Sequence, residues 1–219
     1  MRTMSRLFVV IEGIDGTGKS TVCRRVADVL RTRGIDVAIK PEFPDGDLAE
    51  EFKTALTKGL FLAEHLAMPP AAAFFYLAYA QVVSVASSPA ATIILCDRYL
   101  HTLAIYQSHF VKSAPAPKPT ELLASLEHLF SAFGLPLADV VFLLEASLPT
   151  VSKRLAEREE RAPSSEEEAV LLAFQEIYRH LGSGPSASHF FSIDAERDIS
   201  EVASEISSHI VALLEARPV

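Results

Sequence analysis

The sequence has few cysteines and a deficit of basic residues, and each shortage excludes a class of protein. Its two cysteines, Cys23 and Cys96, are too few for a disulfide framework and lack zinc-site spacing. They are expected to be core thiols in a reducing compartment. The chain carries 20 Lys and Arg against 28 Asp and Glu, a net charge of −8, which argues against a protein that wraps a nucleic acid polymer.

The sequence also lacks an apolar run that reaches the ~18 residues of a membrane span. Arg2 and Arg6 precede an apolar stretch, as in a signal peptide, but that stretch covers only residues 7–11 before Glu12 and a glycine-rich loop, which is typical of a strand. A cytoplasmic enzyme without a membrane partner is therefore expected. With 219 residues, 49% of them hydrophobic, the chain is long enough for one α/β domain.

The most informative stretch is residues 13–20, Gly-Ile-Asp-Gly-Thr-Gly-Lys-Ser, which match the P-loop pattern G-x-x-x-x-G-K-[ST] at every fixed position. The apolar, largely β-branched residues 7–11 predict a buried strand before it. Apolar residues at helical spacing from Val22 to Leu30 predict a helix after it. A strand, a glycine loop and a helix in this order are the context of a true P-loop, so we expect the chain to bind a nucleoside triphosphate.

The chemistry of such a loop assigns roles to its residues. Backbone N–H groups line a concavity for phosphate oxygens, and the following helix adds its partial positive N-terminus. Lys19 is expected to reach the β- and γ-phosphates, and the Ser20 hydroxyl to ligate Mg²⁺. The predicted phosphate-binding residues are Gly13, Ile14, Asp15, Gly16, Thr17, Gly18, Lys19, Ser20 and Thr21.

The rest of the chain alternates between strand and helix patterns. After the first strand and helix, the expected strands are 35–39, 92–96, 140–144 and 190–193, and the expected helices are 48–56, 71–85, 101–110, 121–133, 149–161, 165–181 (with Ser165 as its cap) and 199–214. This alternation predicts an α/β fold, the three-layer sandwich of P-loop NTPases, with a five-stranded parallel sheet and helices on both faces. We expect a single domain over residues 1–219, with a flexible lid around 154–165 and a proline-rich loop at 112–119.

Parallel sheets bind ligands at the carboxyl ends of their strands, and charged residues follow two of the expected strands. Asp97 and Arg98 come after the third strand, and Lys40 comes after the second. Asp97 is suited to hold Mg²⁺ opposite Ser20. Arg98 is suited to bind a second phosphate through two hydrogen bonds. A surface ion pair between Asp97 and Arg98 is the alternative interpretation.

Three segments in this order resemble the thymidylate kinase family, a family of P-loop nucleoside monophosphate kinases. Residues 8–21 resemble the family's opening, and residues 97–107, Asp-Arg-Tyr-Leu-His-Thr-Leu-Ala-Ile-Tyr-Gln, resemble its D-R-x-x-x-S-x-x-A-Y-Q segment. Residues 138–145, with Arg154 and Arg158 beyond them, resemble its P-D-L-x-x-x-L-D strand and R-L-x-x-R lid. The resemblance implies transfer of the ATP γ-phosphoryl group to dTMP, with Mg²⁺ as cofactor, and a homodimer formed through the long helices.

The resemblance also implies residue roles. Gly16 stands where some members carry a P-loop arginine, so a transition-state cation is expected from the lid, unless the lid arginines only pair with neighbouring glutamates. The implied catalytic set is Lys19, Asp15, Arg98, Arg154, Arg158 and Arg161. The implied acceptor-binding set is Lys40, Phe43, Phe75, Tyr79, Arg98, Thr102, Tyr106 and Gln107, although Phe75 is equally compatible with a place in the core.

The sequence departs from the family pattern at two positions of the expected acceptor site. Glu42 stands where the family has an arginine after the second strand, with Lys40 as a candidate replacement, and Tyr79 stands where an arginine reads the thymine edge. Residues 97–102 also resemble the mitochondrial UMP/CMP kinase branch. Two alternatives therefore stay open: a kinase for dUMP, UMP, CMP or dCMP, and an inactive nucleotide-binding module of the same fold.

Overall fold

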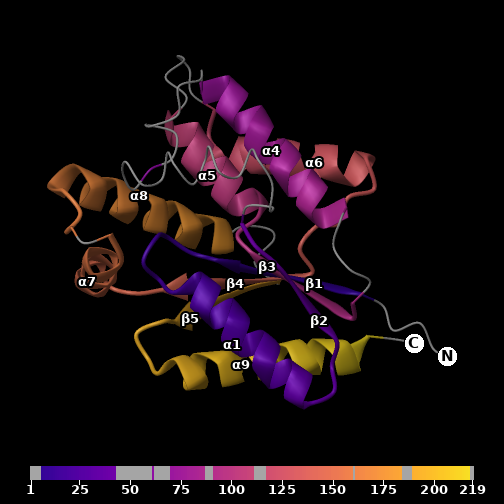
Figure 1. The fold of residues 1–219 in the computed structure, drawn as a ribbon. Helices are drawn as coiled ribbons and strands as arrows, with labels where there is room; N and C mark the ends of the chain where they lie inside the picture. The colour runs from indigo at the N-terminus through magenta and orange to yellow at the C-terminus, as the bar shows by residue number, and fades with distance from the viewer. Residues whose placement is uncertain are drawn as a thin grey trace.

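The computed structural model describes residues 6–42, 61, 70–86, 91–110, 117–159, 161–183 and 189–217, which form layers around a parallel sheet (Figure 1). Its strands are β1 (Leu7–Glu12), β2 (Val37–Lys40), β3 (Ile93–Asp97), β4 (Val140–Glu145) and β5 (Phe190–Asp194). They lie in the order β2-β3-β1-β4-β5, and every pair is parallel. The predicted fold class, a five-stranded parallel sheet with helices on both faces, is confirmed.

Parallel strands need connections that cross from one end of the sheet to the other, and these crossovers are usually helices. Helices therefore cover both faces of this sheet. In Figure 1, α1 (Lys19–Thr32) and α9 (Ile199–Ala216) lie below the sheet. Above it lie α4 (Pro70–Ala86), α5 (Leu100–Phe110), α6 (Pro119–Ala132) and α8 (Ser165–Gly182), with α7 (Leu148–Glu159) beside α8. Among the described helices, none is long and apolar enough to cross a membrane.

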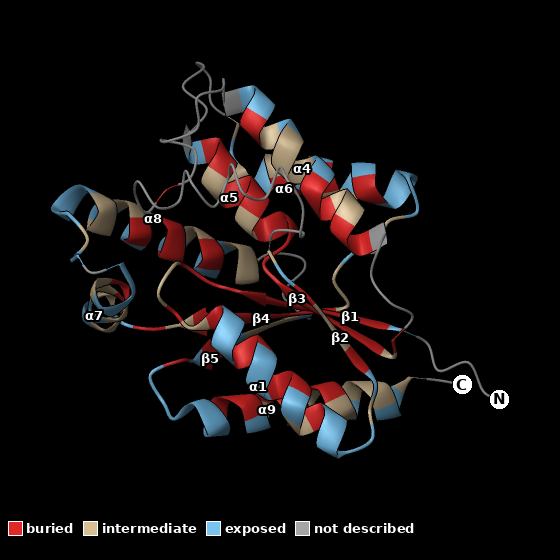
Figure 2. Cartoon of the chain, viewed as in Figure 1, coloured by how far each residue is buried: buried red, intermediate tan, exposed pale blue. Residues whose placement is uncertain are grey.

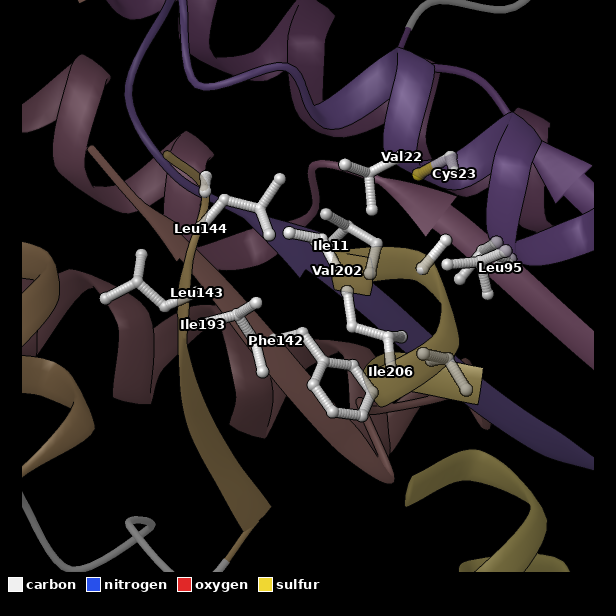
Figure 3. Packing of buried hydrophobic residues seen from close by; sticks show 14 of the residues in the cluster. Ile11, Val22, Cys23, Leu95, Phe142, Leu143, Leu144, Ile193, Val202 and Ile206 are labelled. Atoms are coloured by element: carbon white, nitrogen blue, oxygen red, sulfur yellow. The ribbon is translucent and has the colours of Figure 1, made fainter. Parts of the chain in front are cut away.

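The core lies on both faces of the sheet because successive strand residues point to opposite sides. On the side of α1 and α9, Ile11 and Phe142 pack against Val22, Val202 and their neighbours (Figure 3). On the other side, Phe8, Val10 and Ile94 pack with residues of α5 and α6. Figure 2 shows the consequence: β1, β3 and β4 are buried almost throughout, whereas α1, α7 and α9 each have an exposed outer face. Cys23 and Cys96 are free, buried thiols, as expected.

The structure corrects three expected boundaries. Ser164, rather than Ser165, is the N-cap of α8: its Oγ accepts a hydrogen bond from the Glu167 N–H at 3.2 Å, and Glu167 Oε2 accepts one from the Ser164 N–H at 2.8 Å. Pro119, expected in the proline-rich loop, opens α6, since proline fits the first helical position. The charged helix expected to reach Arg161 ends at Glu159. The expected helix 48–56 and residues 111–116 lie outside the described residues.

Candidate active site

The P-loop follows the carboxyl end of β1, and at two of its positions the structure accepts only glycine. Gly13 has φ of 142°, and a Cβ there would come within 2.7 Å of the Leu144 carbonyl oxygen of β4. Gly16 has φ of 82°, and a Cβ there would meet Val151 and Leu155 of α7 at 3.0 Å. These values of φ disfavour other residues, and the contacts leave them no room. The loop is therefore held tightly between β4 and α7.

Lys19 lies at the start of α1 and is almost fully buried. Its Nζ donates a 2.8 Å hydrogen bond to the Ile14 carbonyl oxygen, and Thr17 Oγ1 donates to the same oxygen at 2.8 Å. Burial, helped by the charge of Arg98, lowers the pKa of Lys19 to about 8, while Asp15 and Asp97 act in the opposite direction. The ammonium group is thus held inside the loop, and because its pKa is lowered, a bound anion would stabilise its charged form.

A cleft of about 830 Å³ opens beside the P-loop. It is bounded by the loop and α1 on one side, by α7 on another, and by the turn from β5 to α9. Its lining is rich in cationic side chains, which suits a polyanionic ligand. The lining residues are Gly16, Thr17, Gly18, Lys19, Ser20, Thr21, Val22, Arg24, Arg154, Glu157, Arg158, Ala195, Arg197, Asp198, Ile199 and Val202.

The structure separates the three expected lid arginines. Arg154 lines the cleft and donates to two backbone carbonyl oxygens, of Thr17 at 3.4 Å and of Ala195 at 2.9 Å. Arg158 also lines the cleft, and its recorded ion pair is with the adjacent Glu159 at 2.6 Å. Arg161 forms a double hydrogen bond with Glu167 of α8, at 2.6 and 2.8 Å, and is not among the cleft-lining residues. The alternative expectation, that these arginines pair with Glu157, Glu159 and Glu160, is met by Arg158, which pairs with Glu159, whereas the partner of Arg161 is Glu167 of α8.

Arg98 follows β3 with φ of 65°, an uncommon value for a non-glycine residue, and is 2% exposed. Its Nη2 lies 2.6 Å from Asp15 Oδ1, and its guanidinium packs over the ring of Tyr106 at 5.0 Å. Tyr106 in turn donates to Asp15 Oδ2 at 2.7 Å. Burial raises the pKa of Asp15, but Arg98 and Lys19 outweigh it, so this pKa lies below its ordinary value. Arg98 therefore forms a charged pair with Asp15 of the P-loop.

A buried carboxylate, Glu12, fixes the backbone around Arg98. Glu12 ends β1 and is 0% exposed. Its Oε1 accepts from the Tyr99 N–H at 2.9 Å, and its Oε2 accepts from the hydroxyls of Thr102 at 2.5 Å and Tyr178 at 3.1 Å. Thr102 Oγ1 also accepts from Arg98 Nη1 at 3.3 Å. The hydroxyl of Thr102, expected near the acceptor, is therefore engaged in holding Arg98.

The two residues expected to hold Mg²⁺ differ in their surroundings, since Ser20 is among the cleft-lining residues and Asp97 is not. Asp97 ends β3 and is 7% exposed, and its Oδ1 is a buried oxygen with no recorded hydrogen-bond partner among the described residues. Ser20 lines the cleft. The described part of the chain contains no cluster of three or more His, Cys, Asp or Glu side chains fit for a metal. This donor set suits Mg²⁺, which keeps waters and is commonly held by one or two protein oxygens together with substrate phosphates.

The remaining expected acceptor residues differ in their surroundings. Gln107 is 4% exposed, and its buried Oε1 has no recorded partner among the described residues. Lys40 is buried and donates to Gln81 Oε1 at 2.7 Å. Phe75 and Tyr79 are 69% and 56% exposed on α4, so Phe75 is not a core residue. Phe43 lies outside the described residues. Among the described residues of this group, Gln107 is the one with a buried polar atom that has no recorded partner.

Sequence reasoning missed the turn from β5 to α9 and the cation it contributes. Arg197 and Ala195 line the cleft, as does Arg24 of α1. The rule that ligands bind at the carboxyl ends of parallel strands could have found this turn, because residues 195–198 directly follow the last strand. It also missed the contact between Glu12 and Tyr178, which join one network from positions 166 residues apart. A local pattern carries no signal for that contact.

Comparisons with known proteins agree with this geometry. A family model described as thymidylate kinase matches residues 11–206. A thymidylate kinase of Bifidobacterium longum subsp. infantis is 29% identical over 215 residues, covering 96% of this chain and 88% of the relative. A thymidylate kinase of Baumannia cicadellinicola is 28% identical, covering 98% and 99% of the two chains. A probable thymidylate kinase of Caldivirga maquilingensis is 26% identical and covers 91% of each.

Proposed function

The chain belongs to the thymidylate kinase family, and from this premise we propose that it transfers the γ-phosphoryl group of ATP to dTMP, giving dTDP. The observation that carries the proposal is the adjacency of two anion-binding groups: the P-loop with Lys19, and the Arg98–Asp15 pair next to it. Phosphoryl transfer depends mainly on placing donor and acceptor in line and on neutralising their charge. A buried lysine and a buried arginine side by side supply that neutralisation.

On the donor side, the P-loop N–H groups and Lys19 bind the ATP phosphates, and the cleft beyond them takes the rest of the nucleotide. Ser20 and Asp97 hold Mg²⁺, which when bound neutralises charge on the phosphate oxygens. Arg154 ties the P-loop to the turn after β5 through its bonds to Thr17 and Ala195. Arg158, which lines the cleft, is the proposed transition-state cation, and it would have to leave Glu159 in order to reach the phosphates.

On the acceptor side, Arg98 binds the phosphate of dTMP. Asp15 and Tyr106 hold the guanidinium in place and are proposed to contact the sugar. Gln107, whose buried Oε1 has no recorded partner among the described residues, is the proposed reader of the base edge. Thr102 acts as a positioning residue through its bonds to Glu12 and Arg98. The retained Lys19, Asp97 and Arg98 and the cleft arginines argue against an inactive module, and no comparison favours another acceptor. A single domain, a homodimer and a cytoplasmic location stay predictions.

We expect dTMP to be the best acceptor, but by a margin of no more than ~10–200-fold over dUMP, because a thymine methyl in an apolar pocket contributes only that much. The arginine that reads the thymine edge is replaced by Tyr79, whose side chain is largely exposed. The measurement is kcat/KM for dTMP, dUMP, dCMP, UMP and CMP under one condition, with ATP consumption as the readout.

Two outcomes of this comparison would revise the proposal. A preference for dTMP above roughly 10⁴ would mean that a further polar group reads the base, since a methyl pocket alone cannot supply it. If no pyrimidine monophosphate is turned over while ATP still binds, the chain is a nucleotide-binding module rather than a kinase.

The lowered pKa of Lys19 predicts that ATP binding weakens in alkaline solution. In the free protein this lysine loses its proton as the pH rises through about 8. ATP favours the charged form, so above that pH binding must take up a proton, and affinity falls by up to about tenfold per pH unit. Calorimetry at pH 7, 8 and 9, in two buffers with different ionisation enthalpies, measures both the affinity and the proton uptake.

The matched control is Lys19→Arg, because a guanidinium keeps its charge over this range. Its ATP affinity is expected to be nearly independent of pH between 7 and 9. Binding by the unaltered protein with no proton uptake at pH 9 would contradict the assignment of this titration to Lys19.

A further inference from the structure

The guanidinium of Arg98 is engaged at all three of its nitrogen atoms. Nη2 pairs with Asp15 at 2.6 Å, Nη1 donates to Thr102 at 3.3 Å, and Nε lies 3.2 Å from Glu42 Oε2. The ring of Tyr106 covers one face at 5.0 Å. A planar guanidinium binds a phosphate best through two parallel N–H groups. An incoming phosphate therefore meets a cation whose nitrogens already serve other groups.

The two carboxylates on Arg98 are held unequally. Asp15 accepts a second hydrogen bond, from Tyr106, and its pKa lies below the ordinary value. Glu42 has Arg98 as its one recorded partner among the described residues, and a third of its side chain, 33%, is exposed. Burial of its carboxyl group, aided by the charges of Asp97 and Asp15, raises the pKa of Glu42 to about 7 although Arg98 and Lys19 oppose this. Glu42 is thus the carboxylate that leaves more easily.

We propose that the Glu42 carboxylate occupies the place of the acceptor phosphate on Arg98, and that the acceptor must displace it in order to bind. The inference rests on the proposed function, because it takes Arg98 as the acceptor-phosphate group. Glu42 then acts as a specificity-determining residue. A phosphate dianion, with two charges and paired oxygens, competes successfully with one carboxylate, whereas an acceptor without a phosphate gains nothing from Arg98.

The competition has a calculable consequence for affinity. When a binding-competent state is populated only in part, the apparent dissociation constant rises by the inverse of that fraction. If Glu42 is bound to Arg98 about nine-tenths of the time, the acceptor binds about tenfold more weakly than it would to a free Arg98. Removing the charge of Glu42 also removes its repulsion of the phosphate. Arg98 stays in place when Glu42 no longer binds it, because Asp15 and Thr102 still hold the guanidinium.

The test is Glu42→Gln, which keeps the shape of the side chain and removes its charge. We expect KM and Kd for dTMP to fall about tenfold, with KM for ATP unchanged and kcat within about twofold. Thymidine, which lacks the phosphate, is the matched ligand, and its Kd measured by calorimetry should not change. Glu121→Gln, which removes the same charge from an exposed position on α6, should leave both constants unchanged.

The outcomes separate this inference from the proposed function. A dTMP affinity that stays the same or weakens in Glu42→Gln overturns the inference, and so does an equal gain for thymidine. If the unaltered protein turns over dTMP in either of those cases, the proposed function survives. If the unaltered protein neither binds nor turns over dTMP, the proposed function fails, and the inference fails with it because Arg98 then holds no acceptor.

Discussion

Replacing Lys19 by alanine is expected to lower kcat by on the order of 10²-fold or more, with the fold intact. The ammonium is buried at the start of α1 and is held by the Ile14 carbonyl, so it acts from a fixed place on phosphates whose charge shifts during transfer. The shape of the loop comes from its glycines and from its packing on β4 and α7, not from this side chain. Steady-state kinetics with saturating ATP and dTMP give the change in kcat.

The matched control is Lys118→Ala, which removes the same side chain from a position where it is 75% exposed. Its kcat should be unchanged, and the melting temperatures of both variants should stay close to that of the unaltered protein. A Lys19→Ala protein that transferred phosphate at the normal rate would remove the basis for the donor site.

The second large effect is expected at Arg158. Arg158→Ala should lower kcat by about 10³-fold and change the Kd of ATP little, because an arginine that acts mainly in the transition state has that signature. Two observations single it out: it lines the cleft, and its charge lowers the pKa of Asp15, so it lies within electrostatic reach of the acceptor side. Arg154, which is bonded to two backbone carbonyls, is expected to act on loop position and hence on KM.

Arg161→Ala is the matched control in the same segment. Its guanidinium is bound to Glu167 at the start of α8, so kcat should stay within about twofold. The comparison needs single-turnover rates for the three alanine variants together with ATP affinities. Equal, small effects for all three would mean that the transition-state cation comes from elsewhere, with Arg24 and Arg197 of the cleft as the next candidates.

The donor half of the site was predictable from sequence because its geometry is local. The P-loop residues 13–20 fix their own shape, and the strand and helix around them carry strong periodic patterns. The parallel direction of the strands followed from the alternation of elements, and ligands bind at the carboxyl ends of such strands. That β1 and β3 are neighbours in the sheet, which brings Asp97 and Arg98 close to the loop, is a finding of the structure.

The acceptor half was less predictable because it depends on contacts between distant segments. That Glu42 reaches Arg98, and that Thr102 turns toward Glu12, depends on where loops and helices meet in space. The cap of α8 was predicted one residue too late for a local reason. Ser164 and Ser165 are each followed three residues later by a glutamate, and the structure forms the capping contacts between Ser164 and Glu167.

α8 is tied to its surroundings at both ends. Tyr178 is bonded to Glu12, and Gln175 donates to the Ala146 carbonyl at 2.9 Å, so the second half of the helix is fixed to the sheet. At its first turn, Ser152 of α7 donates to Glu168 Oε1 at 2.7 Å. We therefore expect α7, which carries Arg154 and Arg158, to move together with α8, so that a shift of the cleft arginines is passed to the helix whose Tyr178 holds Glu12.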